Sequence, residues 1–63
     1  MNPTTPGTRI ELVATGDMFT ELKPGDRGTV TYKDAAGTVF IAWDGGSRLG
    51  LVPDEDTWKE VGQ

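Results

Sequence analysis

Apolar and polar residues alternate in several short stretches of the chain, the pattern of strands with one buried face. In the first stretch, Ile10 and Leu12 alternate with charged residues. Residues 18–22 are extended or turn-like, because Pro24 biases the preceding residue away from the helical region. Five strands with turn residues between them predict a small all-β fold with a central antiparallel meander. The predicted strands are residues 8–13, 28–33, 38–43, 47–52 and 57–61.

Glycine, proline and aspartate mark the predicted reversals. Pro24-Gly25, in the stretch LKPGDRGTV, fits a type II turn, in which proline presets φ and glycine supplies a positive φ. Gly37 is the predicted left-handed residue of the next reversal, and Asp44-Gly45 fits a type I′ hairpin turn. Pro53 is expected to start a short 3₁₀ turn before the last strand. The stretch LKPGDRGTV is therefore interpreted as a corner of the fold.

These elements predict one five-stranded SH3-like β-barrel over residues 8–61. Residues 1–7 are predicted to form a flexible tail, and residues 62–63 a frayed end. A chain of 63 residues buries only about 60% of its unfolded surface, and without Cys it has no disulfide to help. One apolar core, or a partner subunit, must supply the stability. The predicted core is Ile10, Leu12, Leu22, Val30, Tyr32, Val39, Ile41, Trp43, Leu49, Leu51 and Trp58.

The motifs TRIEL, LKPGDRGTV and WDGGS, in this order, resemble a family of small uncharacterised domains. That family comes from actinobacteria, their phages and mobile elements, and is catalogued as a domain of unknown function. The resemblance runs from about Thr8 to Val61. It implies a cytoplasmic setting, the host cytoplasm for a phage-encoded chain, but no activity and no functional residues.

Composition weighs against several classes of function. Ten acidic and six basic residues give a net charge of −4, whereas a phosphate-binding surface needs clustered Lys and Arg. A nucleic-acid accessory domain is therefore the weaker alternative, and it requires Arg9, Lys33 and Arg48 on one face. The start of the chain lacks the pattern of a secretory signal, and its apolar stretches are too short to span a membrane.

No residue set predicts catalysis, a metal site or a cofactor. Ser47 is the only serine and no His can serve it as a base. The acids Asp54, Glu55 and Asp56 lack the spacing of a calcium loop, so solvated turn carboxylates are expected. The glycines of PGDRG match no phosphate-binding motif. Gly25 and Gly28 are better explained by backbone φ and by close packing.

The aromatic residues provide the main binding hypothesis. Phe40 points outward if Val39 and Ile41 point inward, and exposed apolar patches often mark contact sites. The alternatives are that the N-terminal tail or a second copy covers Phe40. We therefore expect a non-enzymatic protein-interaction module, acting on a host protein if phage-encoded, with a homo-oligomer subunit as a further alternative. The predicted apolar anchors are Phe19, Phe40 and Trp58, and the predicted polar rim is Glu21, Asp44, Arg48 and Asp54.

Overall fold

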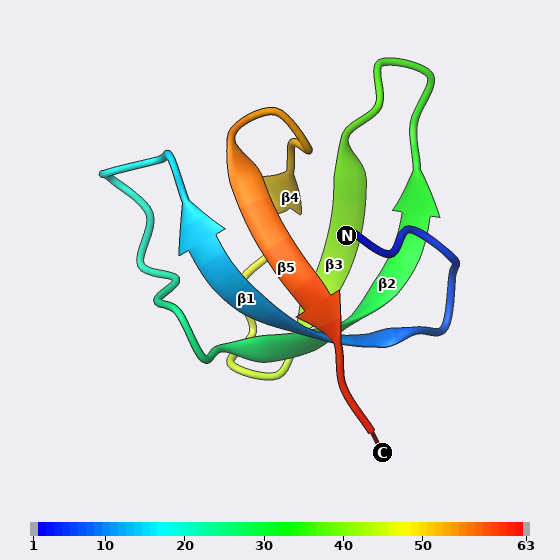
Figure 1. The fold of residues 1–63 in the computed structure, drawn as a ribbon, viewed down its shortest axis with the longest axis horizontal. Helices are drawn as coiled ribbons and strands as arrows, with labels where there is room; N and C mark the ends of the chain where they lie inside the picture. The colour runs from blue at the N-terminus through cyan, green and yellow to red at the C-terminus, as the bar shows by residue number, and fades with distance from the viewer. Residues whose placement is uncertain (1, 63) are drawn as a thin grey trace.

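The protein is all-β, with five antiparallel strands in one sheet (Figure 1). The computed structural model describes residues 2–62, so Met1 and Gln63, the outermost residues of the predicted tail and frayed end, lie outside the described residues. The strands are β1 (Arg9–Thr15), β2 (Arg27–Lys33), β3 (Val39–Trp43), β4 (Gly50–Leu51) and β5 (Asp56–Glu60). The sheet order is β4-β3-β2-β1-β5, so the predicted meander is formed by β2, β3 and β4 and lies at one end of the sheet.

The sheet curls around one apolar core (Figure 1). Within residues 2–62 no backbone pairing joins β4 to β5, so the sheet is not closed into a hydrogen-bonded barrel. The all-β class is confirmed, and nearly all of the predicted core is buried. Leu49 packs against the core while remaining partly exposed. The buried apolar residues are Ile10, Leu12, Leu22, Val30, Val39, Ile41, Trp43, Leu51 and Trp58.

Tyr32 is the core prediction that is wrong, since 54% of it is exposed. The pairing of β2 with β3 shifts by one residue between Val30 and Tyr32. A bulge of this kind places an extra residue in one strand and changes which face the following side chain takes. Val30 points into the core, and Tyr32 lies on the outer face opposite Phe40.

The predicted corner at Pro24-Gly25 is confirmed. Gly25 has a φ of 101°, and the Asp26 N–H donates to the Lys23 carbonyl at 3.0 Å, as a type II turn requires. The Asp26 carboxylate in turn accepts from the Lys23 N–H at 2.9 Å. Backbone bonds of 2.8 Å also join Leu12 to Gly25 and Asp26. These contacts attach the corner to β1.

Gly28 allows β2 and β3 to approach each other closely. A Cβ at Gly28 would lie 2.6 Å from Ile41 Cγ2 and 2.8 Å from the Ala42 carbonyl oxygen. Gly28 is also buried. The structure therefore supports the close-packing explanation for this glycine.

The segment from Asp44 to Val52 differs from its prediction. The positive φ belongs to Gly46, at 93°, and neither Asp44 nor Gly45 has one. A type I′ turn needs a positive φ at both central residues, so that turn is not formed. The strand predicted over 47–52 is reduced to β4, and residues 44–49 form a loop.

The turn before β5 is closed by a buried carboxylate. The Glu55 N–H donates to the Val52 carbonyl at 3.0 Å, which is the spacing of a 3₁₀ turn. The Asp56 carboxylate accepts hydrogen bonds from Thr15 Oγ1 at 2.6 Å and from the backbone N–H groups of Gly16 and Val52 at 3.2 and 2.8 Å. Asp56 thus joins three segments, unlike the solvated carboxylate predicted for it.

The N-terminal segment that was predicted to be a flexible tail makes specific contacts with β5. The Asn2 side chain donates to the Asp56 carbonyl at 3.2 Å and accepts from the Trp58 N–H at 3.0 Å. The Trp58 indole N–H donates to the Pro3 carbonyl at 2.7 Å. Further along, Gly7 and Thr8 exchange backbone bonds with Val30. The segment is therefore part of the folded unit.

Candidate functional site

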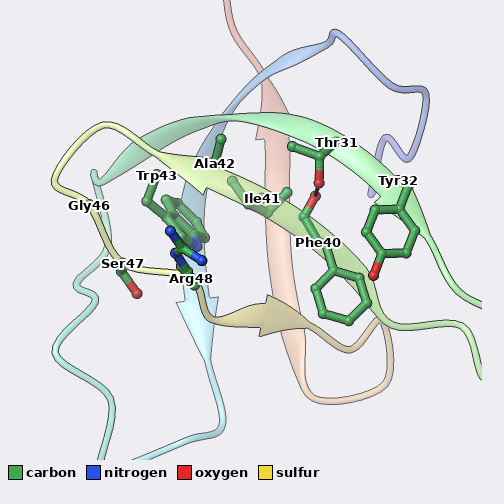
Figure 2. Close-up of a pocket in the computed structure, with 9 residues that line it drawn as sticks. All are labelled: Thr31, Tyr32, Phe40, Ile41, Ala42, Trp43, Gly46, Ser47 and Arg48. Carbon is green, nitrogen blue, oxygen red and sulfur yellow. Dashed lines mark hydrogen bonds between the residues drawn. The ribbon is translucent and has the colours of Figure 1, made fainter.

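A groove of about 530 Å³ lies along β3. We call it the β3 groove. Figure 2 shows Tyr32 and Phe40 at one end of β3, and Ser47 and Arg48 at the other. Its volume lies within the range of pockets that hold small ligands. The lining residues are Thr31, Tyr32, Phe40, Ile41, Ala42, Trp43, Gly46, Ser47 and Arg48.

An aromatic pair forms one end of the β3 groove. The rings of Tyr32 and Phe40 are stacked, with centroids 4.7 Å apart and planes 14° from parallel. Directly opposed residues on neighbouring strands share a face, which explains why these two meet. Phe40 also packs over Gly50, where an added Cβ would lie 3.5 Å from the ring. The half-buried Phe40 thus supports the more exposed Tyr32.

The loop 44–49 forms the other end, and its backbone is held in place. The Gly46 N–H donates to the Trp43 carbonyl at 3.0 Å. The Trp43 indole N–H donates to the Leu49 carbonyl at 2.9 Å, and Ser47 Oγ accepts from the Leu49 N–H at 3.3 Å. An ordered wall loses less conformational entropy when a ligand binds. The groove is therefore largely preformed.

The β3–β4 ladder ends early, which opens the groove. Its pairs are Val39↔Leu51 and Phe40↔Gly50. Beyond Phe40, within residues 2–62, the paired partners of β3 belong to β2 alone. Residues 44–49 form a loop where a longer β4 would have continued.

Arg48 carries the only charge among the described residues that line the groove, and it is exposed. Asp44 lies in the same loop but is already paired. Its carboxylate accepts two hydrogen bonds from the Arg9 guanidinium, at 2.8 and 2.7 Å. These bonds lower the pKa of Asp44 below its usual value and raise that of Arg9. The groove therefore favours an apolar ligand with a negative charge at the Arg48 end.

The structure brings together only Phe40 and Arg48 of the predicted binding residues. Phe19 and Glu21 are exposed in the loop between β1 and β2, and Asp54 is exposed in the turn before β5. None of these three lines the β3 groove.

Trp58 has to be corrected as an apolar anchor, because it is fully buried in the core. It follows Asp56 on the inner face of β5, and its indole N–H is bonded to the N-terminal segment. A partner cannot contact this side chain in the folded protein. The predicted tail therefore covers Trp58, while none of its described residues, 2–7, lines the groove beside Phe40.

Sequence reasoning missed Tyr32 as a site residue. A signal was available in the hairpin, because Asp34 and Thr38 close the turn and set the register next to it. That register pairs Lys33 with Val39 and hence Tyr32 with Phe40. An outward Phe40 therefore implies an outward Tyr32.

The basic residues are partly used within the fold. Three ion pairs form within residues 2–62: Arg9–Asp44 at 2.7 Å, Arg27–Glu11 at 3.0 Å and Lys59–Glu11 at 3.8 Å. Arg9 was one of the three residues required for a nucleic-acid face. Its pairing with Asp44 reduces the positive charge such a face could offer.

The described part of the chain offers neither a metal-binding cluster nor a membrane-spanning helix. Residues 2–62 hold no group of three or more acidic, His or Cys residues able to bind a metal ion. They also contain no helix with the length and apolar character needed to cross a membrane.

Comparison with known proteins gives one match. No curated protein and no solved structure matches the chain. A family match spans residues 2–61, nearly the whole chain. It confirms the part of the resemblance that concerns a domain without known function, and it carries no information on the source organism. The chain therefore belongs to the family described as Domain of unknown function (DUF4314).

Proposed function

We propose that the protein is a non-enzymatic interaction module that binds a protein partner in the β3 groove. The observation that carries this proposal is the preformed groove with a stacked aromatic pair at one end and Arg48 at the other. Aromatic and Arg side chains are enriched among the residues that dominate binding energy at protein interfaces. The site would take an apolar side chain against Tyr32 and Phe40.

The spacing of the groove suggests the form of the ligand. The aromatic pair lies at one end of the groove and Arg48 at the other (Figure 2). A peptide lying along β3 would therefore place an apolar side chain against Tyr32 and Phe40 and an acidic residue toward Arg48. Such a ligand satisfies the apolar wall and the positive charge together.

The source and setting belong to the same proposal. The sequence resemblance points to actinobacteria or their phages, and a phage-encoded module would act on a host protein in the host cytoplasm. The acidic net charge and the pairing of Arg9 with Asp44 support a protein partner over nucleic acid.

Affinity capture from the lysate of the source organism or its host, with and without nuclease, tests this proposal. The bait is the wild-type chain, an Arg48→Glu variant or a matched Lys33→Glu variant. Lys33 is exposed at the end of β2 and does not line the groove, so Lys33→Glu makes the same charge change elsewhere.

We expect a protein that survives nuclease and is captured by wild type and Lys33→Glu but lost with Arg48→Glu. Equal capture by all three baits would contradict binding at the groove. Loss of every band after nuclease would instead indicate a nucleic-acid accessory domain.

A further inference from the structure

The loop between β1 and β2 displays two large apolar side chains. Met18 is 86% exposed and Phe19 is 91% exposed. We call these two residues the apolar tip. In Figure 1 the loop extends away from the sheet at the left of the view. Within residues 2–62 no other part of the protein covers this apolar surface, and such exposure often marks a contact site.

The base of this loop is fixed, so the apolar tip is held outward. The Phe19 N–H donates to the Asp17 carboxylate at 2.9 Å, and the Asp17 N–H donates to Thr15 Oγ1 at 3.1 Å. On the other side, Leu22 is buried in the core and its N–H donates to Thr20 Oγ1 at 3.1 Å. The tip therefore projects from a structured turn.

The apolar tip and the β3 groove are complementary in chemistry. The tip carries Met18 and Phe19 between the acids Asp17 and Glu21, and Glu21 is exposed. The groove offers Tyr32 and Phe40 for the apolar side chains and Arg48 for a carboxylate. No residue of the loop 16–26 lines the groove of its own chain.

We propose that the apolar tip of one chain binds the β3 groove of a second copy, with Glu21 facing Arg48. This inference rests on the proposed function of the groove and names its partner. The two surfaces differ, so the contact is head-to-tail, and contacts of this kind generate rings or open filaments. The contact would involve few side chains of the tip, Met18, Phe19 and Glu21, so we expect weak association that depends on concentration.

Complementation between two variants tests this arrangement. Met18→Ser with Phe19→Ser removes the tip and leaves the groove. Tyr32→Ser with Arg48→Glu removes the groove and leaves the tip. The affected side chains are all exposed, and thermal melts check that both variants fold. Sedimentation velocity follows wild type, each variant and their equimolar mixture over rising concentration, with Lys33→Glu as the charge control.

We expect the mass of wild type and of Lys33→Glu to rise with concentration beyond a dimer, and each double variant alone to stay monomeric. Their mixture should stop at a heterodimer, since it has one intact tip and one intact groove. A monomeric wild type, or a mixture that does not associate, would overturn the inference. Continued loss of lysate capture with Arg48→Glu would then show that the groove binds a different protein.

Discussion

Two glycine-rich turns of this chain have similar sequences but different roles in the structure. The corner at Pro24–Gly28 is attached to β1 by backbone bonds at Leu12, and one of its glycines is packed against β3. The loop 44–49 is bonded to β2 at its first residue, where the Asp44 N–H donates to the Arg27 carbonyl at 3.0 Å, but its glycines lie in open space. The corner therefore stabilises the fold, whereas the loop 44–49 forms one end of the β3 groove.

The difference shows what a turn motif leaves undetermined. Both segments contain an aspartate and two glycines, which are residues that favour a reversal. The path that the chain takes after the reversal depends on contacts from elsewhere in the chain. At the corner these contacts come from β1. In the loop 44–49 the Trp43 indole N–H donates a hydrogen bond to the Leu49 carbonyl. The groove follows from that second arrangement.

The largest difference between the two turns is expected for alanine at Gly28 and Gly45. Gly28→Ala places a Cβ 2.6 Å from Ile41 Cγ2 and 2.8 Å from a carbonyl oxygen. It should reduce the free energy of unfolding by about 2 to 3 kcal/mol, as overpacking does. Gly45→Ala meets nothing within 4 Å and should change it little. If urea unfolding gave similar free energies of unfolding for Gly28→Ala and Gly45→Ala, the proposed difference between the two turns would be contradicted.

Each of the two turns contains one glycine with a positive φ. Alanine at either glycine should reduce the free energy of unfolding by the same amount, but it should weaken partner binding in only one of the turns. Gly25 and Gly46 have φ values of 101° and 93° with no neighbour within 4 Å of an added Cβ. Each substitution should reduce stability by about 1 kcal/mol through backbone strain. Gly46→Ala should also weaken partner capture, because Gly46 lines the groove. Weaker capture by Gly25→Ala instead would contradict the comparison.

A smaller difference in stability is expected when the side chain that accepts a backbone hydrogen bond in each turn is replaced by alanine. The Asp26 carboxylate accepts from the Lys23 N–H at 2.9 Å, and Asp26→Ala should reduce the free energy of unfolding by about 1 kcal/mol. Ser47 makes a longer contact of 3.3 Å with the Leu49 N–H, and Ser47→Ala should be close to neutral. A larger effect for Ser47→Ala in chemical denaturation would show that the loop contributes more to stability than the corner.

The smallest effect is expected for the exposed Arg9–Asp44 pair, which connects the loop 44–49 to β1. Hydrogen bonds from Arg9 lower the pKa of Asp44 in the folded state. The pair therefore contributes fully above the unfolded pKa of Asp44, and its contribution is lost as pH falls through the folded value.

Asp44→Asn should accordingly lower the melting temperature slightly at pH 7 and less in strong acid. Differential scanning at several pH values provides the measurement, with wild type as the reference. A loss of the same size at every pH would show that the charge of Asp44 has no part in the effect.

Alternation along the chain predicted the buried face wherever the strand register continues without a shift. Val39, Ile41 and Trp43 are all buried as their spacing required. Tyr32 was misplaced because alternation along β2 alone takes no account of the bulge before it. Local alternation does not contain that information.

The candidate site could be predicted in part for the same reason. Phe40 faces outward by alternation, and Arg48 was recognised as a polar neighbour. The groove itself needs the loop 44–49 to leave β3, and that path depends on the Trp43 indole and on a positive φ at Gly46. Trp58 was predicted both as a core residue and as an anchor, and its complete burial agrees with the first prediction and excludes the second.

The claim that the β3 groove binds the apolar tip of a second copy is tested most directly by mapping amide chemical shifts. A ¹⁵N-labelled chain with Met18→Ser and Phe19→Ser, whose groove is intact, is titrated with an unlabelled Tyr32→Ser, Arg48→Glu chain, whose tip is intact. We predict shifts concentrated in β3 and the loop 44–49, around Ile41, Ala42 and Arg48. No shifts at the highest concentration, or shifts confined to other strands, would contradict the account.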